Sequence, residues 1–203
     1  MYNKTFANNY NTLGWASFSE QIYKDIRKHT KNKKRVLDIA CGTGVLATQF
    51  IKDGHKVRAF DVSPDMIRVA KKKKTGAMFT IDNMNTFNLK VKFDAITCIY
   101  DSLNHITNWK RFFKNVSKHL EEDGVFIFDY NTIAGLRKWN NSFVNETKET
   151  ICTFKGSYNK DNRSAKLALK CFSKQKDNEL VTIAEDTFKS YTYTKKEVTQ
   201  WLS

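Results

Sequence analysis

Four aspartates follow apolar, strand-like segments at nearly even intervals in the first half of the chain. They are Asp38, Asp61, Asp82 and Asp101, and successive members lie roughly 20 residues apart, about the length of one strand and one helix. Any one of them could simply cap a helix or a turn. Because ligands bind beyond the carboxyl ends of the strands in parallel sheets, the whole set predicts a polar ligand site at one edge of such a sheet.

The second and third aspartates have the chemistry that a nucleoside requires. A carboxylate accepts two hydrogen bonds side by side, so Asp61 suits the two hydroxyls of a ribose. Asp82 suits an exocyclic amine such as that of adenine, with the backbone near Asn83 and Met84 reading the edge of the ring. The Met84 side chain can also pack on the face of the ring. These positions predict a site for an adenosine group.

A carboxylate beside a glycine turn distinguishes two classes of nucleotide ligand. Asp38 lies in an apolar segment just before Gly42, and Gly42, Gly44 and Ala47 fit the pattern G-x-G-x-x-A. Burying a carboxylate costs several kcal/mol unless it finds partners. A dinucleotide would place its pyrophosphate on this turn, where Asp38 would repel it. A ligand with a sulfonium and an α-ammonium group gains from the carboxylate, so the sequence favours S-adenosylmethionine over NAD.

Strand-like and helix-like segments alternate between residues 35 and 130, which is typical of a doubly wound, mostly parallel α/β sheet. The expected strands are 35–40, 56–60, 77–81, 93–100 and 125–130. Amphipathic helices are expected at 15–29 and 108–124, and Ser63 followed by Pro64 marks the start of another. The carboxyl ends of these strands would bring the four aspartates to one edge.

The pattern changes after residue 140. Strand-like segments separated by polar connectors are expected at 149–154, 164–172 and 179–193, and apolar and polar residues alternate most clearly in the second. Such segments are typical of antiparallel strands. A last helix is expected to begin near Thr194.

The composition fits a single domain in the cytoplasm. The chain has 203 residues, of which 40% are hydrophobic, and no apolar run approaches the roughly 20 residues that span a bilayer. The N-terminus lacks the apolar core of a signal peptide. The four cysteines, Cys41, Cys98, Cys152 and Cys171, form no C-x-x-C pair. We therefore expect no metal site and no disulfide, and we predict reduced thiols.

A net charge of +14 leaves nucleic acid open as a partner. The densest clusters of Lys and Arg are 27–35 and 71–74. The first fits a solvated connector, and the second fits the end of a helix, where cations are favourable. No aromatic residues interleave with either cluster, as a surface for single-stranded nucleic acid would require. An RNA substrate therefore remains an alternative.

Residues 35–132 resemble the class I S-adenosylmethionine-dependent methyltransferases. The matching stretches, in the family's order, are VLDIACGTG, VRAFDVSPDMI, IDNMNTF, FDAITCIYDSLNHI and LEEDGVFIFDYNT. The chain is similar to the small-molecule branch from low-GC bacteria. This resemblance implies a Rossmann-like sheet, S-adenosylmethionine as the cofactor and a small-molecule acceptor. The last two strands of the family's sheet have no counterpart in this sequence.

The resemblance also implies how a single domain of this kind is divided. Residues 1–34 would form a helical cap, 35–135 the cofactor-binding core, 136–193 an inserted antiparallel lid over the acceptor, and 194–203 the start of a C-terminal helix. In this branch the inserted sheet can mediate dimerisation, so a second copy of the chain is an expected partner.

The family's motifs carry cofactor contacts over to positions throughout the core. They are Asp38, Ala40, Gly42, Gly44, Asp61, Val62, Met66, Asp82, Asn83, Met84 and Tyr100. Tyr10 is the best candidate for the aromatic residue that covers the cofactor in this branch.

Methyl transfer from a sulfonium is an in-line displacement, so the protein contributes mainly alignment and exclusion of water. A general base is needed only for a protonated nucleophile, and His105 and Asp101 are best placed to act as one. His105 could instead be hydrogen-bonded within its own loop. We expect Asn104 to orient the acceptor or the cofactor.

The acceptor is expected to be a nitrogen or oxygen atom of a small molecule. Amino-methylating nucleic-acid enzymes of this class carry a proline-containing motif after the fourth strand, and cytosine-C5 enzymes carry a Pro-Cys pair. The only proline here is Pro64, so both routes are disfavoured. Other RNA methyltransferases lack such a marker and stay open, as does a non-catalytic module that binds the cofactor.

Overall fold

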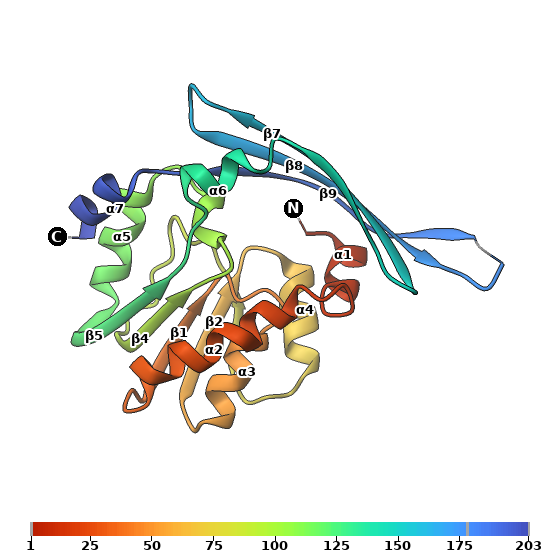
Figure 1. Cartoon of the computed structure of the whole chain (residues 1–203). Coiled ribbons are helices and arrows are strands. Elements are labelled where there is room, and N and C mark those ends of the chain that lie inside the picture. Colours follow the sequence, from red (N-terminus) through yellow and green to blue (C-terminus); the bar gives the residue numbers. More distant parts are fainter. Residues whose placement is uncertain (1, 178, 203) are drawn as a thin grey trace.

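A five-stranded parallel sheet forms the centre of the computed structural model, which describes residues 2–177 and 179–202. Its strands are β1 (Arg35–Ile39), β2 (Lys56–Asp61), β3 (Met78–Ile81), β4 (Phe93–Cys98) and β5 (Leu120–Phe128). The strand order is β3-β2-β1-β4-β5, and every neighbouring pair is parallel. The expected doubly wound α/β fold is confirmed (Figure 1). The order reverses between β1 and β4, where sheets of this kind bind ligands.

Helices cover both faces of this sheet. One face carries α2 (Ala16–Thr30), α3 (Val45–Lys52) and α4 (Pro64–Lys72), and the other carries α5 (Trp109–Lys118) and α7 (Lys195–Leu202). Val36 packs into the first layer and Leu37 into the second, because successive residues of a strand point to opposite faces. Burial on both faces explains why the central strands β1, β2 and β4 read as almost continuous apolar runs.

An antiparallel sheet of order β6-β7-β8-β9 lies over the carboxyl edge of the parallel sheet (Figure 1). Its strands are β6 (Ser142–Glu146), β7 (Thr150–Asn159), β8 (Ser164–Lys174) and β9 (Leu180–Tyr191). The expected antiparallel arrangement is confirmed, but β7 runs on through residues that the sequence assigns to a connector. The sequence does not indicate β6, because all of its residues are exposed and no alternation of burial marks it.

The boundary between α5 and β5 differs from the expected one. The sequence pattern extends the helix to residue 124, whereas α5 ends at Lys118 and β5 begins at Leu120. Leu120 pairs with Phe93, and the register shifts before Val125 pairs with Ala95. This irregularity places extra residues in β5, so the charged residues 121–123 belong to a bulged strand and not to a helix.

A short helix, α1 (Lys4–Asn9), packs between α4 and β9. It lies within the range 1–34 expected to form a helical cap, but no periodic pattern indicates its bounds. Asn3 caps it by accepting a hydrogen bond from the Phe6 amide at 2.9 Å. Asn9 Nδ2 donates to the carbonyl of Ile183 in β9 at 3.2 Å. The N-terminal segment is therefore held between the parallel core and the second sheet.

Cys152 and Cys171 form a disulfide between β7 and β8, so the prediction of reduced thiols is wrong for this pair. The two residues are direct partners in the antiparallel register, and their Cα atoms lie 4.1 Å apart. The spacing of the two cysteines in the sequence does not indicate the bridge. It forms because β7 and β8 pair in a register that places the two residues opposite each other, and the sequence pattern predicts both strands too short to show that register. Cys41 and Cys98 are free.

Reduction of this disulfide is expected to lower the melting temperature of the protein. A bridge that closes a loop of this length contributes about 3 kcal/mol, and a domain of this size loses roughly 2–4 °C for each kcal/mol. Thermal unfolding followed by circular dichroism, with and without dithiothreitol, should therefore show a decrease of several degrees. The double variant Cys152→Ser, Cys171→Ser is the control, because dithiothreitol should not change its melting temperature. If dithiothreitol did not change the melting temperature of the wild type, the two cysteines would not be bridged.

The described part of the chain ends the parallel sheet at β5, which has a neighbour on one side only. Within residues 2–177 and 179–202, none of the helices has the length and apolar character that crossing a bilayer requires.

Candidate active site

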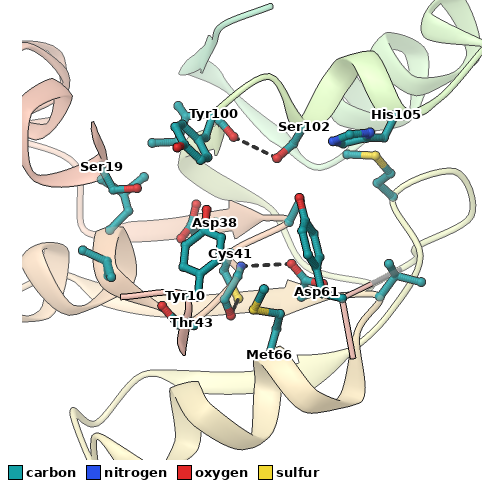
Figure 2. Close-up of a pocket in the computed structure, with 18 of the residues that line it drawn as sticks. Tyr10, Ser19, Asp38, Cys41, Thr43, Asp61, Met66, Tyr100, Ser102 and His105 are labelled. Atoms are coloured by element: carbon teal, nitrogen blue, oxygen red, sulfur yellow. Dashed lines mark hydrogen bonds between the residues drawn. The ribbon is translucent and has the colours of Figure 1, made fainter. Parts of the chain in front are cut away.

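A cavity of about 300 Å³ lies at the carboxyl edge of the parallel sheet, between the ends of β1, β2 and β4 and the strand β9 (Figure 2). Most of the expected ligand-binding residues line it: Tyr10, Asp38, Ala40, Gly42, Asp61, Val62, Met66, Met84 and Tyr100, together with His105. Four of the expected residues do not line it: Gly44, Asp82, Asn83 and Asp101. Among the described residues, no group of three or more His, Cys, Asp or Glu side chains is placed to hold a metal ion.

Asp61 ends β2 and holds the glycine turn in place. Its Oδ2 accepts a hydrogen bond from the Gly42 amide at 2.9 Å, and its Oδ1 accepts one from the Ser63 amide at 2.8 Å. Burial raises the pKa of Asp61, and the two backbone amides oppose that shift. Each carboxylate oxygen keeps a further lone pair. Asp61 can therefore accept two more hydrogen bonds side by side, as the hydroxyls of a ribose would supply.

Asp38 lies in β1 beneath the glycine turn and is 1% exposed. Its Oδ1 accepts a hydrogen bond from Thr97 Oγ1 at 2.9 Å. Its Oδ2 is buried and meets no partner with hydrogen-bond geometry within the described residues. Burial and the nearby charge of Asp61 raise the pKa of Asp38 to about 7, and the Thr97 hydroxyl and the Ala47 amide oppose that shift. A buried carboxylate oxygen without a partner, at the wall of a cavity, is a place for a cationic group.

The turn after β1 depends on left-handed backbone at Ala40, Gly42 and Gly44, with φ of 56°, 53° and 74°. A Cβ on Gly44 would lie 2.7 Å from the ring of Phe79, so this glycine allows the turn to pack on β3. A Cβ on Gly42 would meet no protein atom within 4 Å. Because Gly42 lines the cavity, its missing side chain leaves room for a ligand, whereas the role of Gly44 is one of packing.

The residues after β3 are arranged as a turn. The Asp82 amide donates to the Asp61 carbonyl at 3.2 Å, and the Asn83 amide donates to Asp82 Oδ1 at 2.7 Å. Met84 lines the cavity, while Asp82 and Asn83 lie outside it. Met84 is placed to pack on a ring, and recognition of adenine by Asp82 and Asn83 stays a prediction.

Two residues expected on the acceptor side are turned away from the cavity. Asp101 Oδ2 accepts a hydrogen bond from Asn131 Nδ2 at 2.9 Å, and burial, with the nearby charge of Asp129, raises the pKa of Asp101 to about 7. Asn104 is completely buried, and its Nδ2 donates to the carbonyls of Asn131 and Tyr191 at 3.0 Å and 2.8 Å. Their positions do not support a base at Asp101 or a ligand-orienting group at Asn104. Both side chains instead connect the loop after β4 to neighbouring strands.

His105 has the position expected for a general base. It belongs to the short helix η1 (Ser102–His105) and lines the same part of the cavity as Ser102 (Figure 2). Its Nδ1 lies 3.2 Å from the carbonyl of Lys189 in β9, outside its own loop. A proton on Nδ1 would donate to that carbonyl and leave the lone pair on Nε2. The His105 side chain is partly exposed to solvent, and desolvation by the protein around the cavity lowers its pKa, which favours the neutral ring at neutral pH.

The N-terminal segment and β9 supply an aromatic wall that the sequence indicates only in part. Tyr10 lines the cavity as expected, and Tyr2 and Phe188, which the sequence does not indicate, line it as well. The ring centroids of Tyr2 and Phe188 lie 5.2 Å apart. Thr43 Oγ1 donates to Asn11 Oδ1 at 2.8 Å and so connects the segment to the glycine turn. The aromatic residues near the N-terminus could have indicated Tyr2 as a cavity residue. No feature of the sequence around Phe188 indicates that it lines the cavity.

Comparison with known proteins agrees with this geometry. The family model of a methyltransferase domain matches residues 36–124. The solved structure of an S-adenosylmethionine-dependent methyltransferase from Clostridium acetobutylicum ATCC 824 is 27% identical, with a TM-score of 0.79 over 91% of this chain and 77% of that one. A protein of Geobacillus sp. (strain WCH70) described as a methyltransferase is 32% identical over 58% of this chain and 50% of its own length. The dTDP-3-amino-3,6-dideoxy-α-D-glucopyranose N,N-dimethyltransferase of Streptomyces fradiae is 26% identical over 51% of this chain and 42% of its own.

The parallel sheet, the glycine turn and the two buried carboxylates define a Rossmann-like nucleoside-binding domain. Residues 36–124 match a methyltransferase domain, and together with the fold this match supports a class I S-adenosylmethionine-dependent methyltransferase with S-adenosylmethionine as the cofactor. It spans about half the length of the curated relatives that it matches.

Proposed function

We propose that this protein transfers a methyl group from S-adenosylmethionine to a nitrogen or oxygen atom of a small molecule. The observation that supports this most is the pair of buried carboxylates at one cavity, Asp38 and Asp61. Asp61 suits the ribose, and the unpartnered oxygen of Asp38 suits a positively charged group. An adenosyl sulfonium with an α-ammonium group meets both conditions, whereas a pyrophosphate would be repelled.

The bound cofactor would supply a methyl group already activated on a sulfonium. What the chain itself contributes is alignment of the acceptor and exclusion of water. The rings of Tyr2, Tyr10 and Phe188 close the cavity on the side of the N-terminal segment and β9. His105 Nε2 would accept the proton that the nucleophile loses, while Nδ1 keeps its contact with the Lys189 carbonyl.

An amine is the acceptor class to test first. The Streptomyces fradiae relative is named for N,N-dimethylation of an amino sugar, and a second relative, from Streptomyces venezuelae, is named for the same reaction on a related amino sugar. A primary or secondary amine must also lose one proton after it gains the methyl group, and His105 Nε2 is the base that lines the cavity. The relatives named here do not support the RNA alternative.

Two measurements test the proposal. Calorimetry should show micromolar binding of S-adenosylhomocysteine to the full chain. A screen with a labelled methyl donor should then show transfer to a member of a panel of amino sugars, small amines and phenols, with total RNA as a further acceptor. Absence of binding would end the proposal, labelling of RNA alone would favour the alternative acceptor, and binding without transfer to any acceptor pool would favour a non-catalytic module.

Binding of S-adenosylmethionine is expected to strengthen as the pH rises toward about 7 and to level off above it. Below that pH Asp38 holds a proton, which a positively charged ligand must displace. Each pH unit below the pKa should weaken binding by up to about tenfold. Calorimetry at about pH 6 and about pH 8, in buffers of different ionisation enthalpy, measures both the affinity and the released proton. The Asp38→Asn variant should bind weakly with no such dependence, and equal wild-type affinities would contradict the assignment.

We further infer a homodimer that forms through the second sheet. β6 is an edge strand, and its Phe143 and Val144 are 51% and 62% exposed. An exposed edge strand with apolar residues can pair with a second copy. Light scattering on the wild type and on Val144→Lys tests this, because the charged variant should be monomeric.

A cytoplasmic location also stays a prediction. The disulfide of Cys152 and Cys171 argues against a strongly reducing compartment. Rapid alkylation of thiols in freshly opened cells would show whether the pair is reduced, as the cytoplasmic prediction requires.

A further inference from the structure

Two consecutive residues between β4 and η1 have left-handed backbone. Tyr100 has a φ of 63° and Asp101 a φ of 49°, and neither is glycine. Each such residue costs roughly 1 kcal/mol or more relative to ordinary backbone, so the turn persists only where its surroundings hold it. The turn matters for the site because Tyr100 lines the cavity and leads directly into Ser102 and His105, which line it as well.

The carboxylate of Asp129 holds this turn from the end of β5. Its Oδ2 accepts a hydrogen bond from the Tyr100 amide at 3.0 Å, and its Oδ1 accepts one from the Asp101 amide at 2.7 Å. Its own amide donates to the carbonyl of Cys98, the last residue of β4, at 3.4 Å. Asp129 does not line the cavity. One side chain thus fixes two successive N–H groups in an orientation that these residues disfavour.

Further buried polar groups join this turn to β9. Asn104 Oδ1 accepts a hydrogen bond from the Asn131 amide at 2.7 Å, and Thr192 Oγ1 donates to the Asn131 carbonyl at 2.6 Å. Asn104 Nδ2 also donates to the Tyr191 carbonyl at 2.8 Å. The ends of β4, β5 and β9 therefore form one hydrogen-bonded unit. The position of His105, at the end of η1 and against β9, thus depends on the geometry of the turn.

Asp94 also accepts hydrogen bonds from two successive backbone amides, but it does not hold a cavity wall in place. Its Oδ2 accepts hydrogen bonds from the amides of Lys34 and Arg35 at 3.0 Å and 2.7 Å. These residues lie at the amino end of the parallel sheet, far from the cavity, and neither has a positive φ. A carboxylate that accepts from two successive amides is therefore an ordinary structural cap at Asp94. What differs at Asp129 is the disfavoured backbone and its place at the cavity wall.

We propose that Asp129 is a positioning residue for the methyl transfer proposed above: it holds Tyr100 and Asp101 in the left-handed conformation and so sets the cavity wall formed by Tyr100 and His105. Tyr100 packs on Phe18 of α2, with ring centroids 4.9 Å apart, and this contact depends on the direction that the turn gives the ring. The inference rests on the proposed function, since the wall has a purpose only if cofactor and acceptor occupy the cavity.

The Asp129→Asn variant tests the proposal, because it keeps the size of the side chain but loses one of the two acceptor oxygens. Hydrogen exchange of the Tyr100 and Asp101 amides should accelerate by about tenfold or more, and the affinity for S-adenosylhomocysteine should fall by about tenfold. Asp94→Asn is the matched control. It should accelerate exchange only at Lys34 and Arg35 and leave the affinity within about twofold of the wild type.

A second variant separates positioning from a general loss of stability. Adding Asp101→Gly to Asp129→Asn should recover about threefold in affinity, because glycine adopts the left-handed conformation without strain. Wild-type affinity in Asp129→Asn, an equal loss in Asp94→Asn, or no recovery in the double variant would overturn the inference. If the wild type itself does not bind the ligand, the proposed function fails. Unchanged exchange of the Tyr100 and Asp101 amides would then overturn this inference separately.

Discussion

The Asp61→Ala variant is expected to bind S-adenosylhomocysteine at least about a hundredfold more weakly than the wild type. The substitution removes the two oxygens that would accept hydrogen bonds from the ribose hydroxyls, and it leaves the Gly42 and Ser63 amides without their acceptor. A hydrogen bond to a charged group contributes about 1.5–3 kcal/mol, and each 1.4 kcal/mol is about tenfold in affinity. Two lost bonds therefore correspond to a hundredfold or more, which isothermal titration calorimetry measures directly.

The control for this experiment is Asp65→Ala. Asp65 lies in the first turn of α4 and pairs with Arg68 at 3.3 Å on the surface, outside the cavity. Surface pairs of this kind contribute little, so the affinity should stay within about twofold of the wild type. Asp61→Asn should fall between the two, because the amide keeps one acceptor oxygen. Equal binding by Asp61→Ala and Asp65→Ala would show that the ribose does not lie against Asp61.

The central sheet could be predicted because its signals are local. Strands and helices alternate along the chain, and the central strands β1, β2 and β4 are buried on both faces, so their apolar runs stand out. The start of α4 is an example: Ser63 Oγ accepts a hydrogen bond from the Met66 amide at 3.3 Å, and Pro64 occupies the first helical position. Both features follow from residue types alone.

The parts that the sequence does not show depend on contacts between distant segments. β6 is exposed throughout and is a strand only because β7 pairs with it. The disulfide of Cys152 and Cys171 follows from the register of β7 and β8, which local patterns do not define. α1 is six residues long and is held by α4 and β9, so no periodic pattern could reveal it.

The even spacing of the four aspartates predicts the edge of the sheet but not which side chains enter the cavity. Asp38 and Asp61 lie within or at the end of strands whose direction the pattern defines, and both line the cavity. Asp82 and Asp101 follow their strands in turns, where the side-chain direction depends on φ. The left-handed conformation of Asp101 turns its side chain toward Asn131. That conformation cannot be predicted from the residue type alone.

Replacing His105 with glutamine is expected to lower kcat for an amine acceptor by about a hundredfold or more, with the affinity for S-adenosylhomocysteine nearly unchanged. Desolvation at the cavity wall lowers the pKa of the wild-type imidazole, so its neutral form can accept a proton at neutral pH. Activity should fall when the pH drops below that pKa, as the imidazole becomes protonated. The variant should lose this acidic limb, which a labelled-methyl assay across pH would reveal.

His55→Gln provides the matched control, since His55 Nδ1 also contacts a backbone carbonyl, that of Lys33 at 2.5 Å, at the opposite edge of the sheet. The sulfonium needs no activation, so a base matters only when the nucleophile reaches the cavity with a proton that it must lose. If kcat of His105→Gln equals that of His55→Gln while cofactor binding is intact, the acceptor loses its proton to water before or after transfer. The chain would then accelerate the reaction only by aligning the acceptor and excluding water. The aromatic wall of Tyr2, Tyr10 and Phe188 would contribute most to both effects.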